Sequence, residues 1–295
     1  MFDYRDMLPA GLFEESDGGS GVTVAVIDTG VPRTAGVFPC ISDNFTVESP
    51  DDIDGHATFI GSILFGRGDI RGICPNARPC FVKALSGGIA KPWPISKAID
   101  FAVDSGAKVI NLSFGFPHES GCPDQVAKAC ARARERGAVV VAAAGNDGGS
   151  TTWPASLESV ICVGSGGSEG REVFSCHGDV DFVAPGVDLD VYSLDGSIEK
   201  RSGTSFSAPI VSGIAALIFA RGLRSGRFMT PGEVEDELRE MCTDVGDPGW
   251  DSDTGYGTFA SLGTMKFEDS FLDTSTIRLI FDRIVSYVKS IIARR

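Results

Sequence analysis

Short apolar runs rich in β-branched residues recur along this chain and alternate with segments of helical periodicity. The runs occupy residues 22–27, 81–85, 109–112, 138–144 and 160–163. Strands that are apolar on both faces are typical of parallel sheets covered on both sides. Helical patterns fill residues 57–65, 95–105, 123–136 and 206–220, and Gly222 follows the last of these. The alternation predicts an α/β fold: a three-layer, doubly wound, mainly parallel sheet with helices on both faces.

The length of the chain allows one large domain with flanking segments. With 295 residues, 42% of them hydrophobic and 22% charged, the composition is that of a globular protein. The pattern changes near Leu262, which predicts an N-terminal segment (1–21), an α/β domain (22–262) and a C-terminal tail (263–295). In residues 276–295, apolar side chains at helical spacing are interspersed with arginine and lysine, which predicts a basic amphipathic helix. This helix would dock on the protein's own body, with a partner protein or a membrane surface as alternatives.

Charge and cysteine content exclude several classes of protein. The net charge of −14 disfavours nucleic-acid binding. Residues 1–21 lack the apolar stretch of a signal peptide and no run reaches transmembrane length, so we expect a cytoplasmic protein, with a secreted form as the alternative. The eight cysteines are spread along a long chain without a visible export signal, which favours reduced thiols over a disulfide framework. None forms a C-x-x-C pair, and this spacing disfavours zinc. Cys162 lies in an apolar run and is predicted to be buried.

Polar residues follow two of the predicted strands, where functional groups of parallel sheets gather. Asp28 comes after residues 22–27 and is followed by Thr29 and Gly30, and a carboxylate buried there needs a partner. Asn146 comes after residues 138–144 and Gly145. Taken alone, Asp28 is equally typical of a turn in which the side chain binds its own backbone, and an Asx-type turn is the alternative for Asn146.

A histidine and a serine stand at the starts of two predicted helices. His56 precedes the apolar helix pattern of residues 57–65, and Ser205 leads into residues 206–220. Taken alone, a structural histidine and a helix-capping serine are the commoner interpretations. His118 and His177 lie in polar loops and are predicted at the surface.

Together these segments resemble, in the same order, the signatures of the subtilisin-like serine peptidase family. The signatures are Asp-Thr-Gly at 28–30, a His-Gly-Thr-like element at 56–58, Ala-Ala-Gly-Asn at 143–146 and Gly-Thr-Ser at 203–205 with Ala-Pro at 208–209. Residues 72–77, 109–115 and 184–186 match as well, and the resemblance covers about residues 20–262. It implies a serine endopeptidase acting on polypeptides, with Asp28, His56 and Ser205 as a triad within hydrogen-bonding reach and Asn146 as oxyanion donor.

The resemblance also implies where a substrate would bind. Segments 113–115 and 143–145 would pair with an extended substrate backbone and wall the pocket for its main specificity side chain. The residues concerned are Ser113, Phe114, Gly115, Ala143, Ala144 and Gly145.

Some residues depart from the family pattern. Ala57 stands where the family has glycine, and Gly61 and Ser62 replace an Ala-Gly pair. Residues 66–71 are too short for the usual calcium-binding loop, so we expect no cofactor and assign no metal ligand, with calcium left as an alternative. The aspartates at 51, 52 and 54 are interpreted as a solvated acidic loop.

Three other functions are weighed against a general endopeptidase. One is a processing peptidase for a single precursor, and another is a binding module that keeps the fold without turnover. An esterase of the α/β-hydrolase type would need Gly-x-Ser-x-Gly and the order Ser, Asp, His, whereas position 207 is serine and the order is Asp, His, Ser. For a peptidase, activity should fall below about pH 6 to 7 as His56 becomes protonated.

Overall fold

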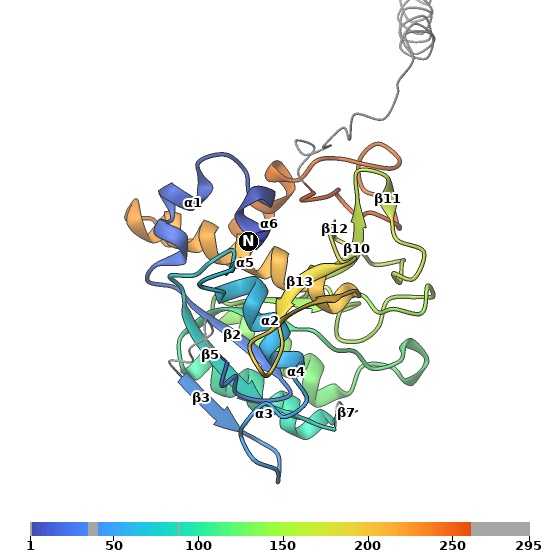
Figure 1. Ribbon diagram of the computed structural model, residues 1–295. Coiled ribbons are helices and arrows are strands. Elements are labelled where there is room, and N and C mark those ends of the chain that lie inside the picture. The colour runs from blue at the N-terminus through green and yellow to red at the C-terminus, as the bar shows by residue number, and fades with distance from the viewer. Residues whose placement is uncertain (1, 35–40, 88, 261–295) are drawn as a thin grey trace, which may run out of the picture. The chain divides into compact units, whose positions relative to one another are not determined.

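A central eight-stranded sheet organises the domain in the computed structural model, which describes residues 2–34, 41–87 and 89–260 (Figure 1). The strand order is β11-β10-β9-β8-β2-β5-β3, and β12 also pairs with β10. Every pairing in this sheet is parallel except that between β10 and β11. The strands are β2 (Thr23–Asp28), β3 (Ile41–Asn44), β5 (Arg78–Lys83), β8 (Ala107–Leu112), β9 (Val139–Ala143), β10 (Ile161–Gly167), β11 (Gly170–Arg171) and β12 (Phe182–Ala184).

Shorter strand pairs and the helices surround this sheet. The strand pairs are β1 (Phe2–Asp3) with β4 (Ile70–Arg71), β6 (Leu85–Ser86) with β7 (Ile89–Ala90), and β13 (Leu189–Tyr192) with β14 (Ile198–Arg201). The α-helices are α1 (Leu12–Glu15), α2 (His56–Phe65), α3 (Pro92–Asp104), α4 (Asp124–Glu135), α5 (Thr204–Arg224) and α6 (Pro231–Met241). The 3-10 helices are η1 (Tyr4–Met7), η2 (Asp17–Gly19) and η3 (His118–Ser120).

Helices cover both faces of the sheet because its strands are apolar on both sides. All residues of β2 are buried, and they alternate between two core clusters. Val24 and Val26 pack in the cluster that contains α2 and α5, whereas Ala25 and Ile27 pack in the cluster that contains α3 and α4. The predicted three-layer α/β fold is therefore confirmed.

The strands and helices predicted within residues 22–222 are all present, with ends that shift by a few residues. For example, α3 begins at Pro92 rather than at residue 95, because proline is well tolerated in a first helical turn. Three strands of the sheet were not predicted, β3, β11 and β12, which have 4, 2 and 3 residues and are too short to give a clear pattern. Helix α6 was not predicted either, although Thr230 and Glu233 form a capping box at its start.

The segment before β2 packs onto the domain. β1 pairs with β4, and the fully buried Tyr4 donates a hydrogen bond from its hydroxyl to the carbonyl of Asp190, at 2.8 Å. The predicted amphipathic helix at 276–295 lies outside the described residues.

The core helix α5 carries the predicted nucleophile at its second position. It is long and apolar enough to cross a membrane, but 89% of its most apolar window is buried inside the domain. Its apolar character is explained by its contacts with the sheet and with α2.

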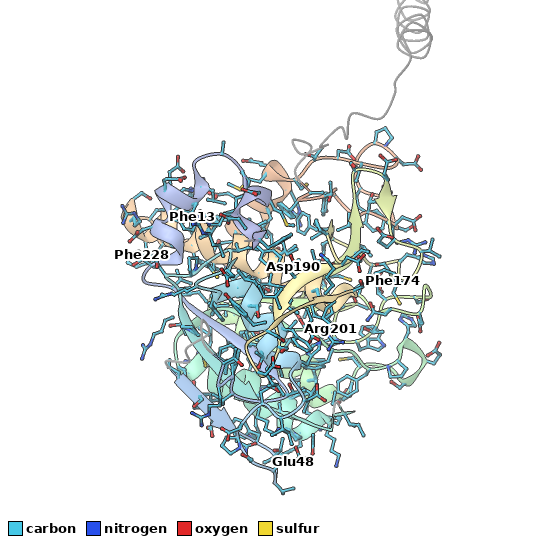
Figure 2. All side chains as sticks on the ribbon, in the orientation of Figure 1. Phe13, Glu48, Phe174, Asp190, Arg201 and Phe228 are labelled. Carbon is cyan, nitrogen blue, oxygen red and sulfur yellow. The ribbon has the colours of Figure 1, made fainter. Side chains whose placement is uncertain are left out.

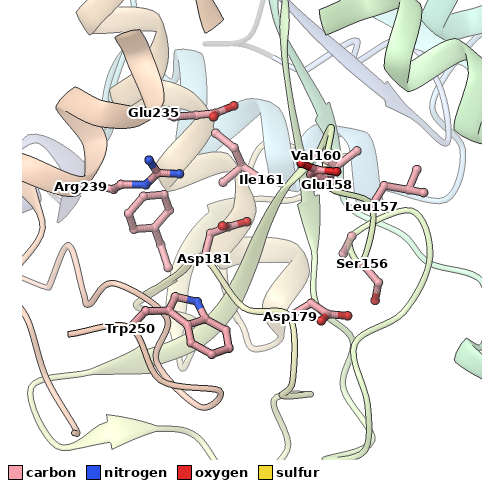
Figure 3. A pocket seen from close by; sticks show the side chains of 12 residues that line it. Ser156, Leu157, Glu158, Val160, Ile161, Asp179, Asp181, Glu235, Arg239 and Trp250 are labelled. Atoms are coloured by element: carbon pink, nitrogen blue, oxygen red, sulfur yellow. The ribbon is translucent and has the colours of Figure 1, made fainter. Parts of the chain in front are cut away.

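A cavity of about 340 Å³ lies at the N-terminal ends of β10 and β12 (Figure 3). Because the strands are parallel, this is the edge of the sheet opposite to the one at which β2 ends with Asp28. Asp181, Arg239 and Trp250 line it. Burial raises the pKa of Asp181 to about 6, even though its carboxylate accepts a hydrogen bond from the backbone of Cys162.

Candidate active site

Asp28 and His56 are hydrogen-bonded to each other at the end of β2 and the start of α2. Nδ1 of His56 lies 2.8 Å from Oδ1 and 3.0 Å from Oδ2 of Asp28. The side chain of Asp28 is fully buried, and its Oδ1 also accepts the backbone N–H of Thr29 at 2.7 Å. The carboxylate therefore has the partners that burial requires, and the interpretation of Asp28 as a self-capping turn residue is incomplete.

The hydrogen bond from His56 to Asp28 fixes the proton on Nδ1, so that Nε2 is the nitrogen with a free lone pair. Burial lowers the pKa of His56, but the charge of Asp28, its hydrogen bond and the charges of Asp54 and Asp52 outweigh that effect. The net result is a pKa raised above the usual value of 6.5. The imidazole is thus a stronger base than a free histidine.

Ser205 lies on α5 beside Ser113, the first residue after β8. Its hydroxyl donates to the carbonyl oxygen of Ser113 at 3.0 Å, and the hydroxyl of Ser113 donates to the carbonyl oxygen of Ser205 at 2.8 Å. Within the described part of the chain, no hydrogen bond joins Ser205 to His56. The ring of Phe206, the next residue, lies 5.9 Å from the ring of His56, so Asp28, His56 and Ser205 are gathered, with the serine hydroxyl turned toward Ser113.

Pro209 explains why the carbonyl of Ser205 is available to Ser113. Proline has no N–H, so it cannot donate to the carbonyl four residues earlier in the helix, which is that of Ser205. The hydroxyl of Ser113 takes the place of that missing donor. It is itself held by Nδ2 of the buried Asn111, at 2.9 Å. A proline inside α5 thus connects the backbone of Ser205 to the end of β8.

The side chain of Asn146 is oriented by the start of α5. Its Oδ1 accepts the backbone N–H of Thr204 at 2.8 Å and the hydroxyl of Thr204 at 3.0 Å. The amide oxygen is therefore occupied, and Nδ2 is left as a donor with no acceptor among the described residues. The N-cap Gly203 allows this approach: its φ is +140°, and a Cβ there would lie 3.4 Å from the Asn146 amide.

The two predicted substrate-binding segments follow neighbouring strands, and Thr152 lies between them. A Cβ on Gly115 would lie 2.1 Å from Oγ1 of Thr152, and a Cβ on Gly145 would lie 2.8 Å from its Cγ2. The backbone N–H of Thr152 donates to the carbonyl of Ala144 at 2.8 Å. The sequence analysis missed Thr152, because it stands in a polar loop with no periodic pattern.

The aspartates at 51, 52 and 54 were predicted to form a solvated acidic loop, and for Asp52 this prediction is wrong. Asp52 is only 5% exposed, and its carboxylate accepts from the hydroxyl of Thr29, from the backbone and hydroxyl of Thr58, and from the backbone of Gly55 at 2.6 to 2.9 Å. These partners lie in the turn after Asp28 and in the first turn of α2. Asp52 therefore fixes the start of the His56 helix against the end of β2, in the manner of a helix cap. Asp54, in contrast, is exposed.

Lys83 is a second buried charge that the sequence analysis missed. It pairs in register with Asp28, is 1% exposed and donates from Nζ to the carbonyl of Thr29 at 2.6 Å. Its ion-pair partner is Glu48, at 3.4 Å. A lysine inside an otherwise apolar run was the available signal, since buried lysines are nearly always paired.

The link between α2 and β5, predicted to be too short for the usual calcium-binding loop, is closed on itself by backbone hydrogen bonds. Gly72 donates to the carbonyl of Gly66 at 2.9 Å, which closes the link tightly, and β4 within it pairs with β1. Across the ranges that the structure describes, no group of three or more His, Cys, Asp or Glu side chains has the arrangement of a metal site.

The remaining histidines lie at the surface, and the described cysteines are free thiols. His118 is exposed and stacks on Trp153, while His177 is partly exposed. The thiols of Cys74, Cys80, Cys122, Cys130, Cys162, Cys176 and Cys242 are free. Cys162 is fully buried, as predicted. Cys40 lies outside the described residues.

Comparison with known proteins places this geometry in context. The model of the subtilase family matches residues 19–257. A thermophilic serine proteinase of Bacillus sp. (strain AK1) is 38% identical over 226 residues, which cover 71% of this chain and 55% of that protein. Subtilisin Savinase of Lederbergia lenta is 33% identical over 209 residues, which cover 68% of this chain and 77% of that protein. The chain spans about half the length of several curated relatives that it matches.

Solved structures with the same fold include two proteases. The prenylagaramide maturation protease PagA superimposes with a TM-score of 0.73 and 30% identity, over 85% of this chain and 96% of that chain. The protease domain of PatA superimposes with a TM-score of 0.71 and 27% identity, over 80% of this chain and 91% of that chain.

Proposed function

The chain belongs to the subtilase family, and on that basis we propose that it is a serine endopeptidase in which Asp28, His56 and Ser205 form the triad. The observation that carries the proposal is the pair of contacts, 2.8 and 3.0 Å long, between Nδ1 of His56 and the buried carboxylate of Asp28. They leave Nε2 as the base in a ring that lies against the residue next to Ser205.

A serine hydroxyl is too weak an acid to attack an amide unaided, so a base must take its proton. In the proposed reaction, Ser205 rotates from the carbonyl of Ser113 toward Nε2 of His56 and attacks the substrate carbonyl. His56 takes the hydroxyl proton and then delivers it to the leaving amine, while Asp28 stabilises the imidazolium. Water then hydrolyses the acyl-enzyme by the same steps.

The tetrahedral intermediate carries a negative oxygen that needs donors already in place. Nδ2 of Asn146 and the backbone N–H of Ser205 are the proposed donors. Thr204 supports this assignment because it occupies the amide oxygen of Asn146 and so leaves the N–H₂ end for the substrate. The N–H of Ser205 lies in the first turn of α5, where helical N–H groups have no intrahelical acceptor.

A processing peptidase for one precursor is the second candidate. The likeness to PagA, whose name describes a maturation protease, supports it. Thr152, between the two proposed substrate-binding segments, is consistent with a restricted choice of side chain. A single dominant cleavage motif in a diverse peptide library would favour this candidate, whereas broad cleavage would favour a general endopeptidase.

A fluorophosphonate probe tests the nucleophile directly. We expect the full chain to be labelled at neutral pH and Ser205→Ala to remain unlabelled, because the probe reacts only with an activated serine. Ser202→Ala is the matched control, since this exposed serine lies three residues earlier and should be replaceable without loss of labelling. Absence of labelling in the wild type would support the inactive binding module instead.

A further inference from the structure

An exposed arginine stands beside the His56 helix in a strongly acidic protein. Arg201 ends β14, and its side chain is 45% exposed (Figure 2). The carbon of its guanidinium lies 4.6 Å from the centre of the Phe59 ring on α2. A guanidinium over an aromatic face is held by cation–π attraction, so its position is defined although it is partly in solvent.

Some N–H groups of the Arg201 guanidinium are not used in its pair with Glu199. Nε and Nη2 both donate to a single oxygen of Glu199, at 3.2 and 2.9 Å. A guanidinium has five N–H groups, so those on Nη1 and one on Nη2 are not used by this pair. Arginine with free adjacent N–H groups is the side chain best suited to bind another carboxylate.

The chemistry of the triad determines which part of a substrate would meet Arg201. His56 gives its proton to the leaving amine, so the chain that leaves must begin beside the imidazole. Phe59 is three residues after His56 on α2, and the ring of Phe206 lies 5.9 Å from the His56 ring and 6.4 Å from the Phe59 ring. Arg201 therefore lies on the imidazole side of the site, where the leaving chain would begin, and Ser113 to Gly115 would bind the acyl side.

The distance from the imidazole to Arg201 sets the reach along the substrate. Side chains three residues apart on a helix, such as His56 and Phe59, are about 5 to 6 Å apart at Cβ. The guanidinium of Arg201 lies a further 4.6 Å beyond the Phe59 ring, so it is roughly 10 Å from the imidazole. An extended peptide advances about 3.3 Å per residue, so this span corresponds to roughly three residues.

We propose that Arg201 selects polypeptides with an aspartate or glutamate within the first three positions after the cleaved bond. The inference rests on the proposed function, since only a catalytic Ser205 and His56 define a leaving-group side. Two carboxylates oppose it: Glu199 shares the guanidinium, and the exposed Asp54 lies two residues before His56. Glu199 therefore sets how strongly Arg201 attracts a substrate carboxylate.

The test is digestion of a diverse peptide library by the full chain, with mass-spectrometric sequencing of the products. For each variant, the frequency of Asp and Glu relative to Lys and Arg after the cleaved bond is counted among its own products. The wild type should enrich acidic residues at these positions. Arg201→Gln should reduce the enrichment about threefold, as expected for one partly exposed charge pair. Arg201→Glu should reverse the preference.

Further variants separate charge recognition from a merely structural role. Arg201→Lys should keep part of the acidic preference, and Glu199→Gln should increase it because the guanidinium is freed. Lys200→Gln is the matched control: Lys200 is adjacent on β14 but binds Asp190 and the carbonyl of Asp188, so the preference should not change.

Two failures can be told apart. If the wild type cleaves no peptide, the proposed function itself is wrong. If it cleaves without acidic enrichment, or if Arg201→Gln retains the full enrichment, the enzyme stands and the role of Arg201 is overturned.

Discussion

Three aspartates near His56 affect the position and the pKa of its imidazole in different ways. Asp28 binds the imidazole, Asp52 binds the backbone that carries it, and Asp54 is exposed and acts on the ring through its charge alone. All three charges raise the pKa of His56. Because the neutral ring is the proposed base, the rate should fall as the pH drops through that raised pKa.

Replacing Asp52 by Asn should change both stability and pH dependence. The amide keeps one acceptor oxygen, but its N–H₂ group faces donors from Thr29 and Gly55 or from Thr58, so the free energy of unfolding should fall by about 2 kcal/mol. Loss of the charge lowers the pKa of His56, which moves the acid limb of kcat/KM to lower pH. Chemical denaturation and a pH–rate profile measure the two effects.

Asp54→Asn is the control for that experiment. It should move the acid limb in the same direction but alter stability by less than about 0.5 kcal/mol, because its side chain is exposed. If Asp52→Asn leaves stability unchanged, the assigned backbone-fixing role is wrong.

Single residues show where prediction from sequence stops. The resemblance to family signatures selected Asp28, His56, Ser205 and Asn146 as candidates, and each stands at a strand end or helix start that parallel topology brings to one edge. The sequence could not place Asp52, whose partners come from two separate elements. It also could not show that the Ser205 hydroxyl faces Ser113, since a rotamer depends on tertiary contacts.

At the level of elements, the packing of α5 requires its backbone at Gly213 to approach the segment after β4 closely. A Cβ on Gly213 would lie 2.6 Å from Cγ2 and 2.8 Å from Cβ of Ile73. Periodicity predicted this helix and its burial, but not that one of its glycines is required by a neighbouring loop. The same reasoning explains why β3 and β12 were missed: their pairing with longer strands, and not their own sequence, makes them strands.

Gly213→Ala should therefore reduce the free energy of unfolding by about 1 to 3 kcal/mol, since either the helix or Ile73 must move. Thermal denaturation measures the change. Gly232→Ala in α6 is the matched control: a Cβ there meets nothing within 4 Å, so the better helix propensity of alanine should leave stability equal or higher. Equal effects of the two substitutions would contradict the close packing of α5.

For the whole molecule, the net charge of −14 makes the placement of each carboxylate important. The buried position of Asp181 disfavours its charged form, since burial raises its pKa from 3.8 to about 6. A carboxyl group whose pKa is raised by folding stabilises the fold while protonated, and that contribution is lost as the pH rises from about 4 to about 6. At neutral pH the charged Asp181 therefore works against folding.

Asp181→Asn should stabilise the protein in a pH-dependent way, because asparagine carries no charge and can still accept from the backbone of Cys162. The gain over the wild type should grow by about 2 kcal/mol between pH 4 and pH 7.5, as measured by chemical denaturation. Asp69→Asn, at an exposed site, should show no such pH dependence. A gain that does not vary with pH would argue against burial as the cause.

The paired hydroxyls of Ser113 and Ser205 impose an exchange on any reaction at this site. A hydroxyl has one proton, so Ser205 cannot donate to the Ser113 carbonyl and to an imidazole nitrogen at the same moment. A donor that displaces Ser205 from the Ser113 carbonyl, such as the N–H of a peptide lying along that segment, would leave the Ser205 proton available for transfer. In the proposed reaction, a substrate lying along residues 113–115 would therefore favour the Ser205 rotamer that faces His56.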